Sequence, residues 1–111
     1  MGATSFVKAA LKYKKKSRHN QHKLVALIIK GGNILSVGWN MVTTHAEKAA
    51  IEHAWRQGDL ANTSMFVIRF RKSGTLGMAL PCKNCQLAIQ AAGIKKVSYS
   101  TNDGQILTVK L

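Results

Sequence analysis

The stretch LVALII at residues 24–29 decides the class of fold, because it is a continuous apolar run of strand length. Its β-branched content is typical of a central strand that is covered on both faces of a sheet. Gly31 and Gly32 follow it as a tight-turn signal. Apolar residues then alternate in a pattern that predicts a second strand, at Leu35, Val37 and Trp39.

Helix and strand patterns alternate through the rest of the chain. Helices are expected from Thr4 or Ser5 onward, over residues 45–57 and over residues 82–92. Strands are expected over residues 65–70, 97–100 and 106–109. A helix between the third and fourth strands implies a parallel pair, and Asp103-Gly104 predicts an antiparallel hairpin for the last two strands. The expected fold class is α/β, a mixed sheet with helices on its faces.

Length and composition place the chain among small intracellular proteins. Its 111 residues are expected to form one domain, residues 1–111, and a hydrophobic content of 46% is enough for a packed core. No apolar run approaches the roughly 18 residues that cross a bilayer. No signal peptide is visible either, so we expect a cytoplasmic protein that does not contact membranes. Two cysteines are too few for a disulfide-rich secreted scaffold.

Positive charge is a second constraint on function. The chain has 17 Lys and Arg against 4 Asp and Glu, a formal net charge of +13. This excess favours a polyanionic partner, above all nucleic acid, and a simple solubility bias is the alternative. The candidate phosphate-binding residues are Lys12, Lys14, Lys15, Lys16, Arg18 and Lys23, with Arg69, Arg71 and Lys72 as secondary candidates.

Two short motifs carry candidate metal ligands. His45-Ala46-Glu47 is expected to open one helix, and Pro81-Cys82-Lys83-Asn84-Cys85 is expected to open another. Cys82 and Cys85 share one face of a helix, and a helix N-terminus favours their thiolate forms. Two thiolates and one imidazole give Zn²⁺ three protein ligands and leave a fourth position for water, which is typical of a catalytic zinc site.

Each motif alone has an ordinary structural interpretation. Thr44 and Glu47 match a helix capping box, and the Cys-x-x-Cys pair is compatible with redox chemistry or with two buried thiols. A thioredoxin-like site would leave His45 and Glu47 unexplained. A zinc finger with two Cys and two His needs histidines after the Cys pair, and none follows Cys85. The conjunction of the two motifs is therefore the specific signal.

The chain resembles the cytidine deaminase-like superfamily over nearly its whole length. The resemblance rests on three motifs in order, Gly38-Trp39-Asn40, Thr44-His45-Ala46-Glu47 and Pro81-Cys82-Lys83-Asn84-Cys85. It implies a three-layer α/β/α fold with a five-stranded mixed sheet. It also implies these roles: zinc ligands at His45, Cys82 and Cys85, the catalytic proton shuttle at Glu47, and substrate contacts at Asn40, Ala46 and Leu80.

The resemblance implies a zinc-dependent hydrolytic deaminase that converts cytosine to uracil in a nucleotide or a single-stranded nucleic acid. A histidine ligand is similar to the deoxycytidylate, transfer-RNA adenosine and polynucleotide branches, whereas an antiparallel final strand pair is similar to the free-nucleoside branch. The alternatives are an adenine-to-hypoxanthine deaminase acting on RNA and a non-catalytic zinc-containing nucleic-acid-binding module. Members of the family are commonly dimers or tetramers, and a homo-oligomer is expected here as well.

Overall fold

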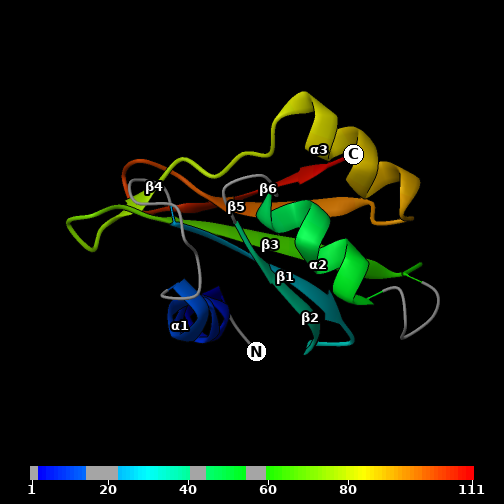
Figure 1. The fold of residues 1–111 in the computed structure, drawn as a ribbon, viewed down its shortest axis with the longest axis horizontal. Helices are drawn as coiled ribbons and strands as arrows, with labels where there is room; N and C mark the ends of the chain where they lie inside the picture. Colours follow the sequence, from blue (N-terminus) through cyan, green and yellow to red (C-terminus); the bar gives the residue numbers. More distant parts are fainter. Residues whose placement is uncertain (1–2, 15–22, 41–44, 55–59) are drawn as a thin grey trace.

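The computed structural model describes residues 3–14, 23–40, 45–54 and 60–111 (Figure 1). In chain order the elements are α1 (Ala3–Tyr13), β1 (Lys23–Lys30), β2 (Asn33–Trp39), α2 (Ala46–Ala54), β3 (Thr63–Phe70), β4 (Leu76–Gly77), α3 (Lys83–Ala91), β5 (Lys96–Ser100) and β6 (Ile106–Lys110). Among the described residues, no helix has the length and apolar character that crossing a bilayer requires.

The strands form one mixed sheet in the order β2-β1-β3-β5-β6. β1 lies antiparallel to both β2 and β3, β3 lies parallel to β5, and β5 lies antiparallel to β6. The expected fold class, the parallel pair and the antiparallel final pair are thus confirmed. The short β4 pairs with the end of β3 and was not expected, because two residues are too few to show an alternating pattern.

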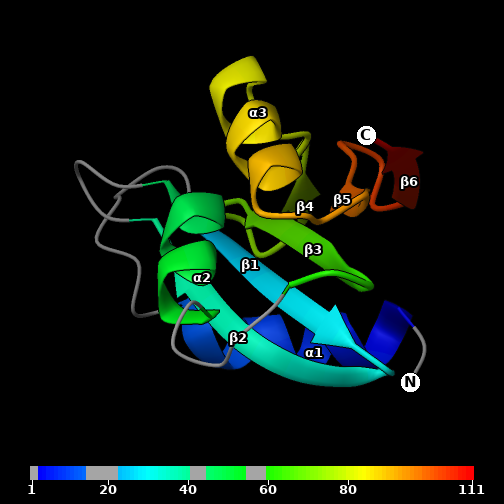
Figure 2. The same ribbon diagram turned by 90° about the vertical axis from the view of Figure 1, so that its right-hand side faces the viewer.

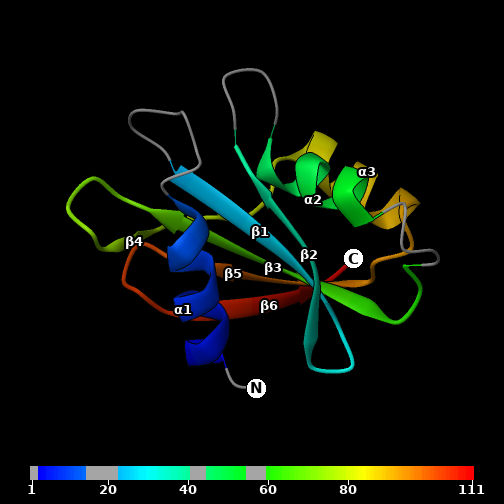
Figure 3. The ribbon, with the colours of Figure 1, turned by 60° about the horizontal axis from the view of Figure 1, so that its bottom comes forward.

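β1 is an interior strand of the sheet, between β2 and β3, and contributes to two separate cores. Its residues Val25, Leu27 and Ile29 pack in the core that includes Phe6 of α1. Ala26 and Ile28 belong instead to the core beneath α2 and α3. The ribbon views show α1 on one face of the sheet and the other two described helices on the opposite face (Figure 2, Figure 3). The three-layer arrangement is therefore confirmed.

The start of α1 and the described end of α2 can be compared with the helix bounds expected from the sequence. The first helix already includes Ala3, so Thr4 and Ser5 lie inside it and the prediction that one of them caps it is wrong. Alanine is the best helix former, which favours this earlier start. The second helix is described as far as Ala54, and residues 55–57 of its expected span lie outside the described residues.

α2 lies directly against β2 because Gly38 has no side chain. A Cβ atom at Gly38 would lie 2.2 Å from the backbone nitrogen of Ala50 and 2.3 Å from the carbonyl oxygen of Ala46. The buried hydroxyl of Ser36 also donates a hydrogen bond to the Ala50 carbonyl over 2.7 Å. Close backbone approach and this hydrogen bond together set where α2 begins above the sheet.

We expect Gly38→Ala to lower the free energy of unfolding by about 2 kcal/mol or more, because the added methyl group meets backbone atoms that cannot rotate away. Urea denaturation of the purified protein measures the change. Gly77→Ala is the control, since its Cβ would lie 3.1 Å from the flexible side chain of Arg69. Equal losses in the two variants would mean that contact at Gly38 does not govern the packing of α2.

Candidate metal centre and active site

Three potential metal ligands meet where α2 and α3 begin. The Nδ1 atom of His45 lies 3.2 Å from Sγ of Cys85 and 3.9 Å from Sγ of Cys82. All three donor atoms lie within 4.8 Å of one another. Fold topology therefore brings the two sequence motifs together, although His45 and Cys82 are 37 positions apart in the chain.

The local backbone explains how each helix presents its ligands. His45 immediately precedes α2, and its carbonyl oxygen accepts the N–H of Ala49 over 3.1 Å. His45 is thus the N-cap residue rather than a residue of the helix. Cys82 is the N-cap residue of α3, and Cys85 lies in the first turn of that helix. Two helix N-termini consequently face the same small volume.

The geometry of these donors fits a zinc ion. A tetrahedral site with Zn–S bonds of about 2.3 Å and a Zn–N bond of about 2.0–2.1 Å requires donor atoms about 3.5–3.8 Å apart. The separations of 3.2 and 3.9 Å from His45 to the two sulfur atoms bracket this range. One imidazole and two thiolates are also a donor set that zinc prefers. Zn²⁺ is therefore the cofactor that these residues are suited to hold.

Glu47 lies beside the donors and is not the last residue of a capping box. Because His45 accepts the first hydrogen bond of the helix, Glu47 lies one position before the place that a box requires. Thr44 lies outside the described residues. The Glu47 side chain is buried, with 5% of it exposed, and it forms a hydrogen bond with Cys85. Burial raises the pKa of the Glu47 carboxyl group above its ordinary value.

Burial has a similar effect on one of the two thiols. It raises the pKa of Cys85 to about 12, and the nearby Glu47 carboxylate adds to the rise. The positive end of the helix dipole favours a thiolate at this position, but loss of solvent outweighs it. In the metal-free chain Cys85 therefore keeps its proton at neutral pH, and a metal ion must displace that proton to bind.

The loop that leads to Cys82 is held by the end of β5. The hydroxyl of Ser100 donates to the Gly77 carbonyl over 2.7 Å, and the Ser100 carbonyl accepts the N–H of Ala79 over 2.9 Å. Oδ1 of Asn102 accepts another backbone N–H of the same loop over 3.0 Å. Ser100 and Asn102 were not predicted from the sequence, because no local pattern marks a residue whose partner lies 23 positions away, as the partner of Ser100 does.

The structure describes all three residues that are expected to contact the substrate. Asn40 is buried at the end of β2, and its Oδ1 atom accepts the N–H of Leu24 over 2.9 Å. Ala46 is fully buried as the first residue of α2. Leu80, just before the cysteine motif, is 45% exposed. Contacts of these residues with a base or sugar stay predictions, and Asn40 already has a structural role in joining β1 to β2.

Two of the candidate phosphate-binding residues lie at the end of the sheet where β1 begins and β3 ends. Lys23 begins β1 and is paired in register with Phe70, the last residue of β3. Nζ of Lys14 lies 5.6 Å from the centre of the Phe70 ring. Arg71 donates to Oδ1 of Asn102 over 2.6 Å, so its guanidinium group already binds the loop. Of the other candidates, Lys12 and Lys72 are exposed, and Lys15, Lys16 and Arg18 lie outside the described residues.

Comparison with protein families gives one match of nearly full length. Residues 2–101 match the model described as the cytidine and deoxycytidylate deaminase zinc-binding region. Among curated protein sequences, none is a significant match.

Solved structures of similar fold include several deaminases. Cytidine deaminase from Burkholderia pseudomallei has a TM-score of 0.77 at 18% identity, with 99% of this chain and 93% of that chain covered. The dCMP deaminase from cyanophage S-TIM5 has a TM-score of 0.72 at 24% identity, with coverage of 92% and 86%. A tRNA:A34 deaminase structure has a TM-score of 0.62 at 24% identity, with coverage of 91% and 79%. At these identities the likenesses establish the fold.

We expect the zinc affinity to rise with pH through the neutral range. Cys85 by itself contributes about a tenfold rise for each pH unit, because its thiol must lose a proton to bind the metal. The folded-state pKa of about 12 lies above this range, so the proton is present in the metal-free chain at every pH tested. Competition with a chromophoric chelator measures the affinity.

His45→Gln should weaken binding by more than about 100-fold. His53→Gln, which changes a histidine outside the donor cluster, should retain zinc. A pH-independent affinity, or equal losses in both variants, would contradict this assignment.

Proposed function

The chain belongs to the cytidine and deoxycytidylate deaminase family, and from this premise we propose that it is a zinc-dependent hydrolytic deaminase converting cytosine to uracil. The substrate carries phosphate, as a nucleotide or as single-stranded nucleic acid. The observation that carries the proposal is the position of Glu47, a buried acid with a raised pKa that touches the donor cluster. A site that only held metal for stability would have no use for such an acid.

The chemistry divides between the metal ligands and Glu47. His45, Cys82 and Cys85 would hold zinc, which when bound supplies a Lewis acid that makes water a nucleophile at neutral pH. Water adds at the amino-bearing carbon of the base, and the amino group leaves as ammonia. Glu47 accepts a proton from the attacking water at its carboxylate and returns protons to the ring nitrogen and the leaving group. Its burial helps the carboxyl group to hold a proton between these transfers.

Charge supports a substrate that carries phosphate. Lys14 and Lys23 lie at the end of the sheet from which β2 leads toward α2, and Lys12 and Lys72 are exposed. The dCMP deaminase of cyanophage S-TIM5, which has a similar fold, has been crystallised with dCMP and dUMP. Affinity for a polynucleotide should fall steeply with salt, whereas affinity for a mononucleotide should fall weakly.

Adenine in RNA is the second candidate substrate, because a tRNA:A34 deaminase structure also shares the fold. A non-catalytic zinc-containing nucleic-acid-binding module is the third candidate. The three differ in product: a cytosine deaminase forms uracil, an adenine deaminase forms hypoxanthine, and a binding module forms neither.

We expect the zinc-loaded protein to form uracil from dCMP or from single-stranded DNA or RNA, with unphosphorylated cytidine as the comparison substrate and base conversion measured by chromatography. Glu47→Gln should reduce turnover by about 10²–10⁴-fold, because the proton shuttle is removed, while zinc content stays at the wild-type level. Glu52→Gln, an exposed acid on the same helix, is the matched control and should keep turnover within a few-fold. Near wild-type turnover in Glu47→Gln would contradict its role.

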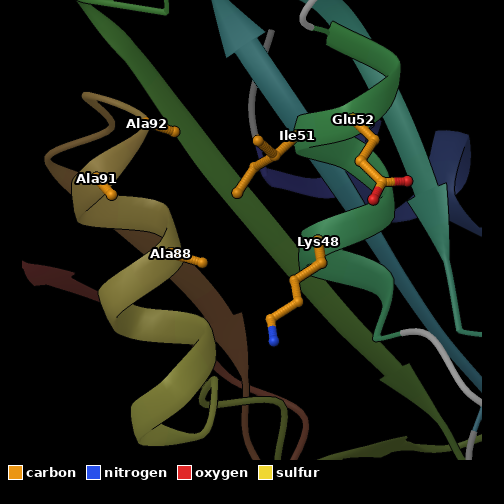
Figure 4. A pocket seen from close by; sticks show the side chains of 6 residues that line it. All are labelled: Lys48, Ile51, Glu52, Ala88, Ala91 and Ala92. Atoms are coloured by element: carbon orange, nitrogen blue, oxygen red, sulfur yellow. The ribbon is translucent and has the colours of Figure 1, made fainter.

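We further propose that the chain forms a homo-oligomer through a groove between α2 and α3. The groove has a volume of about 390 Å³, and Ile51, Ala88, Ala91 and Ala92 line it (Figure 4). Leu87, on the same helix as the alanines, is 56% exposed. Lys48 and Glu52 flank the groove with opposite charges one helical turn apart. A two-fold axis between them would place Lys48 of each copy against Glu52 of the other copy.

Sedimentation velocity at micromolar concentration should then show a species larger than one chain. Ala91→Glu should shift it toward the monomer, because the change places a charge inside the apolar groove. Gln90→Glu adds the same charge at a neighbouring exposed position outside the groove and should leave the distribution unchanged. A monomeric wild type would rule out this assembly.

A further inference from the structure

Lysines also gather at the end of the sheet opposite the donor cluster. Lys30 ends β1, Lys95 and Lys96 stand at the start of β5, and Lys110 ends β6. The donor cluster lies at the other end, where β2 leads into α2. No ion pair is recorded for these four lysines within the described part of the chain. Their charges are therefore not neutralised by the described acidic residues.

A hollow of about 370 Å³ lies at this end of the sheet, here named the far-end hollow. The residues that matter for its chemistry are Gly31, Gly32, Asn62, Ser64, Lys95 and Lys96. None of the described acidic residues, Glu47, Glu52 and Asp103, lines it. Asp59 lies outside the described residues. The hollow thus combines two ammonium groups with polar groups of no charge.

Strand register explains why a serine and a lysine lie together there. Met65 of β3 is paired with Val97 of β5 in the parallel ladder, so that the preceding residues, Ser64 and Lys96, are neighbours on the same face. The structure gives the Ser64 hydroxyl no hydrogen-bond partner among the described residues. Two adjacent strands therefore carry a serine and a lysine at neighbouring positions of the same face.

Two glycines of the β1–β2 turn also line this hollow. Gly31 and Gly32 have φ angles of +58° and +81°, the left-handed conformation in which glycine carries no steric cost. Neither of their N–H groups has an acceptor among the described residues. A Cβ atom built at either glycine would meet no atom within 4 Å, so the space beside the turn is open. Successive N–H groups in such turns form concavities that bind anions.

We propose that the far-end hollow is a second anion site, separate from the candidate active site, and that it binds a phosphate group. Lys95 and Lys96 supply charge, and the Ser64 hydroxyl and the N–H groups of the turn supply directed hydrogen bonds. Phosphate oxygens accept hydrogen bonds from all of these groups, and lysine is a common phosphate ligand. The phosphate belongs either to a small molecule or to a nucleic-acid backbone. The proposal does not depend on the proposed deamination.

Amide NMR spectra of the ¹⁵N-labelled, zinc-loaded chain test the proposal. Titration with inorganic phosphate, against chloride at matched ionic strength, should shift the amide signals of Gly31, Gly32 and Ser64 in a saturable way. Lys95→Gln/Lys96→Gln should weaken this binding at least tenfold while the rest of the spectrum keeps its folded pattern, because both side chains are exposed. Lys8→Gln removes one positive charge from an exposed position on α1 and should leave the binding unchanged.

A second pair of titrations identifies the source of the phosphate. Oligothymidylate contains no cytosine or adenine, so that any shifts it causes are independent of deaminase activity. Binding of oligothymidylate that is tighter than that of thymidine monophosphate and falls steeply with salt assigns the hollow to a nucleic-acid backbone. Equal binding of the two assigns it to small phosphate-bearing molecules. The proposal would be overturned if the amide signals of Gly31 and Gly32 do not shift with any probe, or if they shift equally in Lys95→Gln/Lys96→Gln.

Discussion

The separations of 3.2 and 3.9 Å between His45 and the two sulfur atoms depend on where two helices begin. α2 begins where it does because Gly38 lets its backbone lie against β2, with no room for even one carbon atom between them. α3 begins where it does because Ser100 holds the preceding loop on the end of β5. The sheet therefore acts as a common base for both helix starts, and a shift of either one separates the donors.

The same burial that brings the donors together makes the metal-free site electrostatically unfavourable. Desolvation raises the pKa of Cys85 to about 12 and also raises that of Glu47, against the dipoles of two helix N-termini. Cys85 then keeps its proton at neutral pH, and Glu47 holds a proton up to a higher pH than an exposed glutamate does. A divalent cation reverses this preference at the thiol, because the thiolate gains a partner charge in a poorly solvated place. Metal binding and the protonation state of the site are consequently coupled.

Local patterns in the sequence were enough to predict most of the helices and strands. The features that they did not predict depend mostly on long-range packing. The apolar run of β1, the glycine turn after it and the Asp-Gly hairpin each depend on residues close in the chain, and all appear as expected. The three metal-donor residues could be predicted from the sequence, because each of the two helix starts carries a short motif. The close approach at Gly38 and the anchoring by Ser100 depend on partners that are distant in the sequence and meet only in the folded chain. A glycine or a serine in a strand gives no local sign of such a partner. The two-residue β4 has no pattern to detect.

We assign His45, Cys82 and Cys85 as the ligands of one zinc ion, with one coordination position left for water. X-ray absorption at the zinc edge of the metal-loaded protein measures the ligand shell directly. This ligand assignment predicts two sulfur atoms at about 2.3 Å and one imidazole nitrogen at about 2.0–2.1 Å, together with one further light atom. A shell of four sulfur atoms, or one made only of nitrogen and oxygen, would contradict it.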